Sequence, residues 1–162
     1  MAKNYWLFKS EPGTYPIDDL ARDGKTYWDG VRNYQARNFL RDRVKKGDLV
    51  FFYHSNAEPA GIAGLARVAK DGYPDPSAWD PQDRHYDPLS KRERPVWYGV
   101  DIEFVRKFDR MIPLETLRKV KGLEKMPLLK RGQRLSVQPV SQREAELILG
   151  TAALSKKRLI PA

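Results

Sequence analysis

Residues 28–38 combine side chains suited to holding a flat, polar, anionic ligand. The segment reads Trp-Asp-Gly-Val-Arg-Asn-Tyr-Gln-Ala-Arg-Asn. Trp28 offers an aromatic plane, Gly30 allows close backbone approach, and the amide and guanidinium groups can form hydrogen bonds. Stacking of a base on an aromatic ring contributes about 1–3 kcal/mol, and amide side chains can read a base edge. The segment predicts a nucleotide site; the alternative is a core tryptophan followed by a turn.

The charge of the chain favours an anionic partner. Its 162 residues hold 30 Lys and Arg against 21 Asp and Glu, a net charge of +9. Between Glu103 and Arg134, ten cationic side chains stand against four carboxylates. A basic surplus attracts polyanions through phosphate contacts and counterion release. The charge therefore indicates nucleic acid, RNA or DNA, as the partner, although a solvated basic surface without a ligand would have the same composition.

Several classes of protein are disfavoured by what the sequence lacks. No apolar run approaches the roughly 18–20 residues of a membrane span, and the first residues lack the apolar region of a secretory signal. Cysteine is absent, which excludes disulfides and thiolate nucleophiles, and the presence of only two histidines, His54 and His85, argues against a histidine-rich metal centre. We expect one monomeric domain over residues 1–162, cytoplasmic (or nuclear in a eukaryote), with no membrane, metal or cofactor.

Short strands and a few helices make up the expected secondary structure. Apolar and alternating runs predict strands over residues 5–8, 48–54, 61–69, 96–104 and 135–138, the last stopped by Pro139. Periodicity and capping signals predict helices over residues 17–21, 35–44, 114–120 and 142–149, the last opened by a capping box at Ser141 and ended by Gly150. Strands and helices do not alternate regularly, so the pattern predicts an α+β, barrel-like fold.

Residues 71–95 fit no regular element. They hold five of the twelve prolines, with Tyr73, Trp79 and Tyr86 between them. Long proline-rich loops in compact domains are usually functional or disordered, and the interleaved aromatics favour an ordered excursion over the domain surface. Such an excursion would either frame a ligand site or cover a sheet edge.

Five segments in register resemble a known family. They are residues 6–12 (Trp-Leu-Phe-Lys-Ser-Glu-Pro), 28–38, 52–55 (Phe-Tyr-His-Ser), 95–97 (Pro-Val-Trp) and 135–140 (Leu-Ser-Val-Gln-Pro-Val). Over nearly the whole chain, from about Tyr5 to Gly150, this order closely resembles the EVE domain family of the PUA-like superfamily, which is related to YTH domains. The resemblance implies a PUA-like β-barrel (pseudobarrel) with flanking helices and a pocket for a flipped or unpaired modified nucleobase.

The resemblance also implies roles for particular residues. It makes Trp28 an aromatic wall, with Lys9 and Ser10 beside it at the end of the first strand. Asn33 and the backbone of Gly30 and Val31 would read the base edge. His54 and Ser55 would end the strand that closes the site. The candidates for a second aromatic wall are Tyr34, Tyr53, Trp79 and Trp97. The implied phosphate contacts are Arg32, Arg37 and Arg41.

Structural alternatives stand beside several of these roles. Ser10 could bond to backbone in a turn, and Asn33 could cap the helix over residues 35–44. His54 could be a satisfied histidine at a strand end, and Trp97 could be a core residue.

Three classes of function follow from this interpretation. The first is a non-catalytic reader of a modified base, in which the pocket supplies selectivity and the basic surface supplies affinity. The second is a PUA-like module that binds unmodified structured RNA. The third is an enzyme, for which the sequence offers no cysteine nucleophile, no zinc-deaminase ligand set and no G-x-S-x-G elbow. We therefore expect no catalytic residues.

Overall fold

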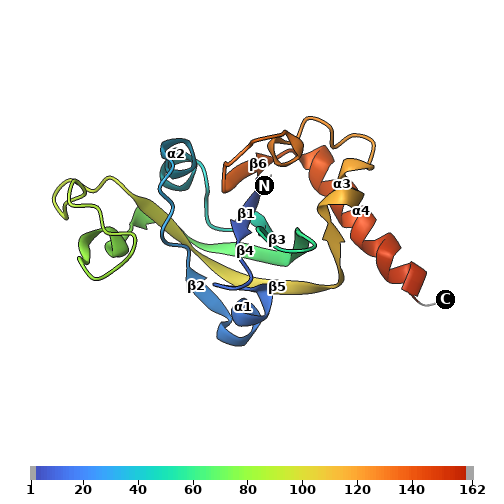
Figure 1. Ribbon diagram of the computed structural model, residues 1–162, viewed down its shortest axis with the longest axis horizontal. Helices are drawn as coiled ribbons and strands as arrows, with labels where there is room; N and C mark the ends of the chain where they lie inside the picture. Colours follow the sequence, from blue (N-terminus) through green and yellow to red (C-terminus); the bar gives the residue numbers. More distant parts are fainter. Residues whose placement is uncertain (1–2, 160–162) are drawn as a thin grey trace.

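The computed structural model describes residues 3–159 and contains a six-stranded mixed sheet flanked by helices (Figure 1). The strands are β1 (Tyr5–Ser10), β2 (Lys25–Tyr27), β3 (Leu49–His54), β4 (Gly61–Pro74), β5 (Tyr98–Pro113) and β6 (Val137–Val140). They lie in the order β2-β5-β4-β3-β1-β6, and only β1 and β3 pair in parallel. The expected α+β class is confirmed, with an open rather than a closed sheet.

The two longest strands bend the sheet. β4 and β5 pair in an antiparallel ladder whose register shifts at four places. Such irregularities increase the local twist and bend of a strand, so the open sheet is curved rather than flat.

Four α-helices flank the sheet: α1 (Ile17–Asp23), α2 (Tyr34–Asp42), α3 (Leu114–Arg118) and α4 (Gln142–Leu159). Two short 3-10 turns, Pro76–Trp79 and Pro127–Leu129, lie in the long connections. Figure 1 shows α4 at one end of the molecule and the loop after β4 at the other. No helix among residues 3–159 is long and apolar enough to cross a membrane.

Several predicted boundaries were wrong. β4 continues to Pro74 and β5 to Pro113, past the predicted ends at residues 69 and 104, so residues 71–74 are strand and not part of the irregular segment. The capping box at the start of α4 is present, since Glu144 N–H donates to Ser141 Oγ over 3.1 Å and Ser141 N–H donates to the Glu144 carboxylate over 2.9 Å. The helix nevertheless continues through Gly150 to Leu159, because a glycine inside a helix costs only about 1 kcal/mol. Pro139 lies within β6 rather than ending it, which an edge strand tolerates because it needs no N–H on its open side.

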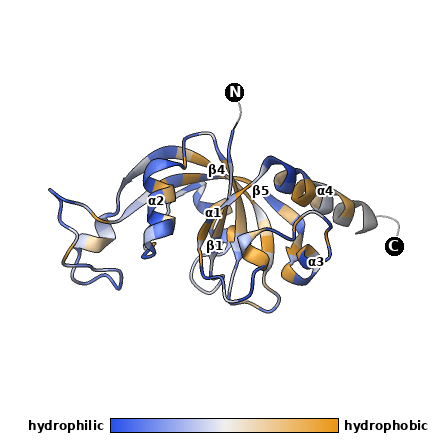
Figure 2. Ribbon diagram, turned by 90° about the horizontal axis from the view of Figure 1, so that it is seen from above, coloured by the Kyte–Doolittle hydropathy of each residue, from blue (hydrophilic) through white to orange (hydrophobic). Residues whose placement is uncertain are grey.

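Alternate residues of the central strands enter two separate cores. On one face of the sheet, Trp6, Phe8 and Phe52 pack with α1 and α2. On the other, Leu7 and Phe51 pack with residues of α3 and α4. Successive side chains of a strand point to opposite faces, so the continuous apolar runs of β1 and β3 follow from burial on both sides. Figure 2 shows the apolar residues gathered on the strands, with α2 and the loop after β4 mostly hydrophilic.

Candidate functional site

A pocket of about 850 Å³ opens where β1 and β3 end. These strands are parallel and in register, with Ser10 beside His54, so the residues that follow them emerge at the same edge of the sheet. The loop after β2 crosses this edge. The lining comes from five segments: 9–15, 26–32, 55–56, 84–85 and 133–136.

Trp28 forms part of the pocket wall and of the core at once. It lines the pocket, but only 9% of its surface is exposed. Its ring packs against Phe8 and Phe52, with centroid distances of 5.4 Å and 5.6 Å. The backbone N–H of Trp28 donates to Val100 O over 2.8 Å. The two predictions for Trp28, that it is a core residue and that it forms a wall of a ligand pocket, are therefore compatible. Packing in the core holds the aromatic ring rigidly at the pocket.

The backbone after Trp28 turns at Gly30, whose φ is +76°. A Cβ added at Gly30 would lie 2.6 Å from two atoms of the His85 ring. The Gly30 N–H donates to Asp75 Oδ2 over 2.8 Å. Glycine adopts this left-handed conformation without steric cost, so its place in the motif has a backbone reason and a packing reason.

Asp75 is fully buried and holds the pocket loop in place. Its carboxylate accepts hydrogen bonds from the backbone and side chain of Ser77, from Gly30 and from Arg32. Burial raises the pKa of this carboxyl, but the hydrogen bonds from these three residues outweigh it and leave the pKa below its ordinary value. The guanidinium of Arg32 also donates to His85 O. Asp75 therefore ties the residues after β4 to the pocket loop.

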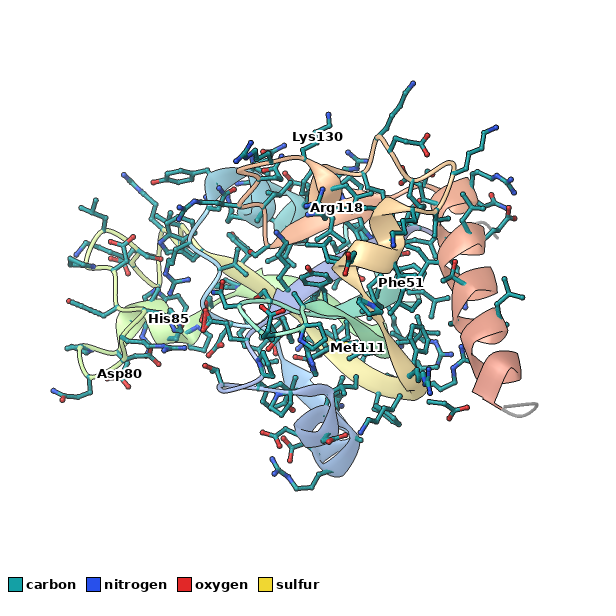
Figure 3. The ribbon with its side chains drawn as sticks, turned by 45° about the vertical axis from the view of Figure 1, so that its right-hand side comes forward. Phe51, Asp80, His85, Met111, Arg118 and Lys130 are labelled. Atoms are coloured by element: carbon teal, nitrogen blue, oxygen red, sulfur yellow. The ribbon has the colours of Figure 1, made fainter. Side chains whose placement is uncertain are left out.

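The proline-rich segment frames the pocket. Arg84 and His85 from this segment line it, and the backbone N–H of His85 donates to Asp83 over 2.8 Å. In Figure 3, His85 lies on the side of the loop toward the sheet, whereas Asp80 lies farther out. Residues 71–95 were expected either to frame a ligand site or to cover a sheet edge. Residues 84–85 lie at the pocket, in agreement with the first expectation.

Both signs of charge face the pocket. The cations Lys9, Arg84 and Arg134 line it together with the carboxylates of Glu11 and Asp29. Burial lowers the pKa of Lys9. Burial, followed by the charge of Asp75, raises the pKa of Asp29. Among residues 3–159, no group of three or more His, Cys, Asp or Glu side chains is placed to hold a metal ion.

A sequence model of the EVE domain family matches residues 4–151. The chain belongs to the EVE domain family. Human thymocyte nuclear protein 1 is 46% identical over 165 residues, which cover 90% of this chain and 72% of that protein.

Solved EVE domain structures have the same fold. A Pseudomonas syringae protein superposes with a TM-score of 0.88 at 47% identity, covering 91% of this chain and 99% of that one. The human THYN1 protein, solved in complex with DNA containing 5-methylcytosine, superposes with a TM-score of 0.83 at 43% identity, covering 93% and 98%. The family resemblance and the pseudobarrel expectation are confirmed.

Within this EVE domain, many residues singled out from the sequence line the pocket: Lys9, Ser10, Trp28, Gly30, Val31, Arg32 and Ser55. Several of them also have partners within the domain. Lys9 Nζ donates to Gln133 O over 3.5 Å, and the Gly30 N–H donates to Asp75. Ser10 Oγ donates to Tyr15 O over 2.5 Å, and Arg32 forms the ion pair with Asp75 over 3.0 Å.

Other predicted residues lie outside the pocket lining. Asn33 caps α2, its side chain accepting from Ala36 N–H over 2.9 Å. His54 Nε2 accepts from Ile17 N–H over 3.1 Å, and Tyr53 is buried in the core on the α4 side of the sheet.

The remaining predicted aromatics and arginines lie on or near α2 and the loop after β4. Tyr34 stacks on Trp97, and Arg92 lies over the ring of Trp79. Arg37 donates to Val96 O, and Arg41 pairs with Asp42. None of these side chains belongs to the pocket lining.

Sequence reasoning missed several residues that build the pocket. Tyr15 lines it from the loop before α1, Tyr27 from the end of β2, and Gln133 and Arg134 from the loop before β6. Asp75 and His85 act from the proline-rich segment. The proline content of that segment was the available signal, but it did not indicate which residues turn inward.

Proposed function

We propose that this EVE domain binds nucleic acid and holds one modified base in the pocket beside Trp28, without changing it chemically. The observation that carries the proposal is a rigid aromatic plane at a pocket whose loop is fixed by Gly30 and Asp75. The pocket volume of about 850 Å³ lies within the range of roughly 300–1,000 Å³ found for small-molecule sites.

The ligand class follows from a solved relative. The human THYN1 protein was solved with DNA containing 5-methylcytosine, and this chain is 43% identical to it over most of both chains. We therefore propose a modified cytosine in DNA as the first ligand to test. The relatives' name, thymocyte nuclear protein 1, favours a nuclear location if the chain is eukaryotic; a cytoplasmic monomer remains the expectation otherwise.

Phosphate contacts are proposed for the cations at the pocket rather than for every arginine of the motif. Lys9, Arg84 and Arg134 line the pocket and have no carboxylate partner among the ion pairs of residues 3–159 that the structure describes. Arg32 already pairs with buried Asp75. If its guanidinium moved to a phosphate, the buried carboxylate of Asp75 would lose its charge partner. Arg41 is half exposed and pairs with Asp42, and an exposed pair of this kind is weak enough to exchange for a phosphate.

The test is a binding panel of matched oligonucleotides. Each probe carries one central 5-methylcytosine or cytosine, as single-stranded DNA, duplex DNA or RNA. We expect tighter binding to the methylated DNA by about ten-fold, the lower end of what one extra carbon gives in a hydrophobic pocket, because the lining of this pocket is partly polar and charged. Affinity should fall by about ten-fold or more between 50 and 200 mM salt if several phosphates are contacted.

Two results would overturn the proposal. Equal affinity for methylated and unmethylated probes of every kind would rule out a modified base as the ligand. Preference for an unmodified structured RNA would favour a PUA-like module that binds such RNA. Mass spectrometry of the probe after prolonged incubation should show an unchanged oligonucleotide. A cleaved or converted base would make the domain an enzyme.

A further inference from the structure

An aromatic stack with one exposed ring lies near the pocket but outside its lining. The rings of Tyr34 and Trp97 have centroids 4.9 Å apart and an interplanar angle of 28°. Trp97 is buried, whereas 61% of Tyr34 is exposed. A large aromatic side chain that is both exposed and ordered by stacking is a surface on which another flat group can stack.

The support beneath Tyr34 is rigid. Trp97 Nε1 donates to Asp87 Oδ2 over 2.7 Å, which fixes the orientation of the indole. Tyr34 is the first residue of α2, directly after the Asn33 cap, so its backbone position is set by the helix start. A flanking base would meet a plane that is already in place, and little side-chain entropy would be lost on binding.

Arg32 connects the stack to the pocket. Its guanidinium lies 5.2 Å from the Trp97 ring centroid, and Arg32 itself lines the pocket. Two steps of 5.2 Å and 4.9 Å therefore lead from the pocket lining to the Tyr34 ring. Stacked bases of one strand are spaced by about 3.4 Å, and the spacing grows where a strand is unstacked. A strand whose base enters the pocket past Arg32 would therefore bring a neighbouring base to the Tyr34 ring if it is unstacked and extended at that step.

A positive charge lies beside the stack. The Arg37 guanidinium is 5.1 Å from the Tyr34 centroid and 5.9 Å from that of Trp97, and its Nη1 donates to Val96 O. A cation held over these rings places a positive charge beside the stack, which favours a ligand that is flat and carries a negative charge nearby, as a nucleotide does.

We propose that the ring of Tyr34, supported by Trp97, is a second stacking platform that takes a base flanking the one in the pocket. This inference rests on the proposed function, since it assumes that nucleic acid occupies the pocket. It adds that the domain reads a base together with its neighbour, so that a lone modified nucleoside binds more weakly than the same base within a strand.

The experiment separates the pocket from the platform. The probes are single-stranded DNAs with a central 5-methylcytosine or cytosine, whose neighbouring positions on both sides either keep their bases or are abasic. Wild-type protein should bind the abasic-flanked strand about ten-fold more weakly, because one base stack is lost. Tyr34→Leu should bind the intact strand more weakly than wild type by the same factor. Its affinity should not fall further when the flanking positions are abasic. Tyr34→Phe, which keeps the ring, should behave as wild type.

The control is Leu154→Ala, which removes an exposed apolar side chain from α4, at the opposite end of the molecule from the loop after β4 (Figure 1). It should leave all four affinities unchanged. The preference for 5-methylcytosine should persist in Tyr34→Leu, because the pocket is intact; its absence in the wild type would contradict the proposed function, not the platform. Wild-type affinity that does not depend on the flanking bases overturns the platform without any variant. A Tyr34→Leu protein that still responds to abasic flanks overturns it equally.

Discussion

The backbone N–H of Gly30 donates to the carboxylate of Asp75 over 2.8 Å. These residues are 45 positions apart in the chain, and their contact joins the loop after β2, which carries Trp28, to the segment after β4. On the other side of Gly30, the His85 ring occupies the space that a Cβ would need. The shape of the pocket therefore depends on one glycine being packed between two residues of the proline-rich segment.

Replacing Gly30 by alanine should damage the pocket more than the fold. Its φ of +76° is disfavoured for alanine by about 1–2 kcal/mol, and the new methyl group must displace the His85 ring. We expect a loss of about that size in the free energy of unfolding, measured by urea denaturation. Binding to the methylated strand should be reduced by about ten-fold or more, since a displaced His85 enters the space that the ligand would use.

Gly24→Ala is the matched control for this change. Gly24 has a φ of +78°, and nothing lies within 4 Å of the position of its missing Cβ. A positive φ disfavours alanine there as well, without a change in the pocket, so stability should fall and binding should not change. If both variants lose affinity equally, general destabilisation is the cause and His85 has no special part.

His54 should make stability depend on pH. Its Nε2 accepts the N–H of Ile17 at the start of α1, a bond that only the neutral imidazole can accept, and burial lowers its pKa. The unfolded chain protonates this histidine near its ordinary value of 6.5, at higher pH than the folded protein does. The unfolded state therefore binds more protons in this window, so stability is full above about pH 6.5 and falls as the pH drops through the folded pKa.

The measurement is the urea midpoint between about pH 7.5 and pH 5.5 for wild type and His54→Gln. Glutamine can still accept from Ile17 but does not titrate, so the variant should show a shallower pH slope, by at most one proton per molecule. Identical slopes would mean that His54 titrates alike in the folded and unfolded states.

Local signals predicted the elements whose pattern is complete within a few residues. The apolar runs of β1 and β3 and the capping box of α4 needed no distant partner to be recognised. β2, by contrast, has only three residues and no apolar run; it is a strand because Lys25, Thr26 and Tyr27 pair with β5. Such an element exists through long-range pairing, which a single sequence does not reveal.

The candidate site divides in the same way. The motif around Trp28 predicted the pocket wall, because an aromatic, a glycine and polar groups lie within one short segment. The partners Asp75 and His85 come from a segment whose composition indicates only an excursion. The competition for a second aromatic wall could not be resolved from residue type, since Tyr34 and Trp97 stack on each other outside the pocket, while Tyr53 alternates onto the opposite face of the sheet.

Trp28→Leu should abolish discrimination between methylated and unmethylated strands. The leucine keeps an apolar contact with the core but offers no plane on which a base can stack, and the loss of one base stack corresponds to about ten-fold or more in affinity. Because 91% of the residue is buried against Phe8 and Phe52, the variant should also lose about 2–4 kcal/mol of stability. Binding is therefore compared at a temperature well below the Tm of the variant.

Phe8→Leu separates the two effects of that change. Phe8 is fully buried, contacts the Trp28 ring from the core side and is not part of the pocket lining. Its truncation should cost stability of similar size and leave the ratio of affinities for methylated and unmethylated DNA unchanged, because the indole stays at the pocket. If Phe8→Leu abolishes that ratio as fully as Trp28→Leu does, the tryptophan acts as a core residue and the base is read elsewhere. If only Trp28→Leu does so, the exposed part of this largely buried ring is the surface that senses the base.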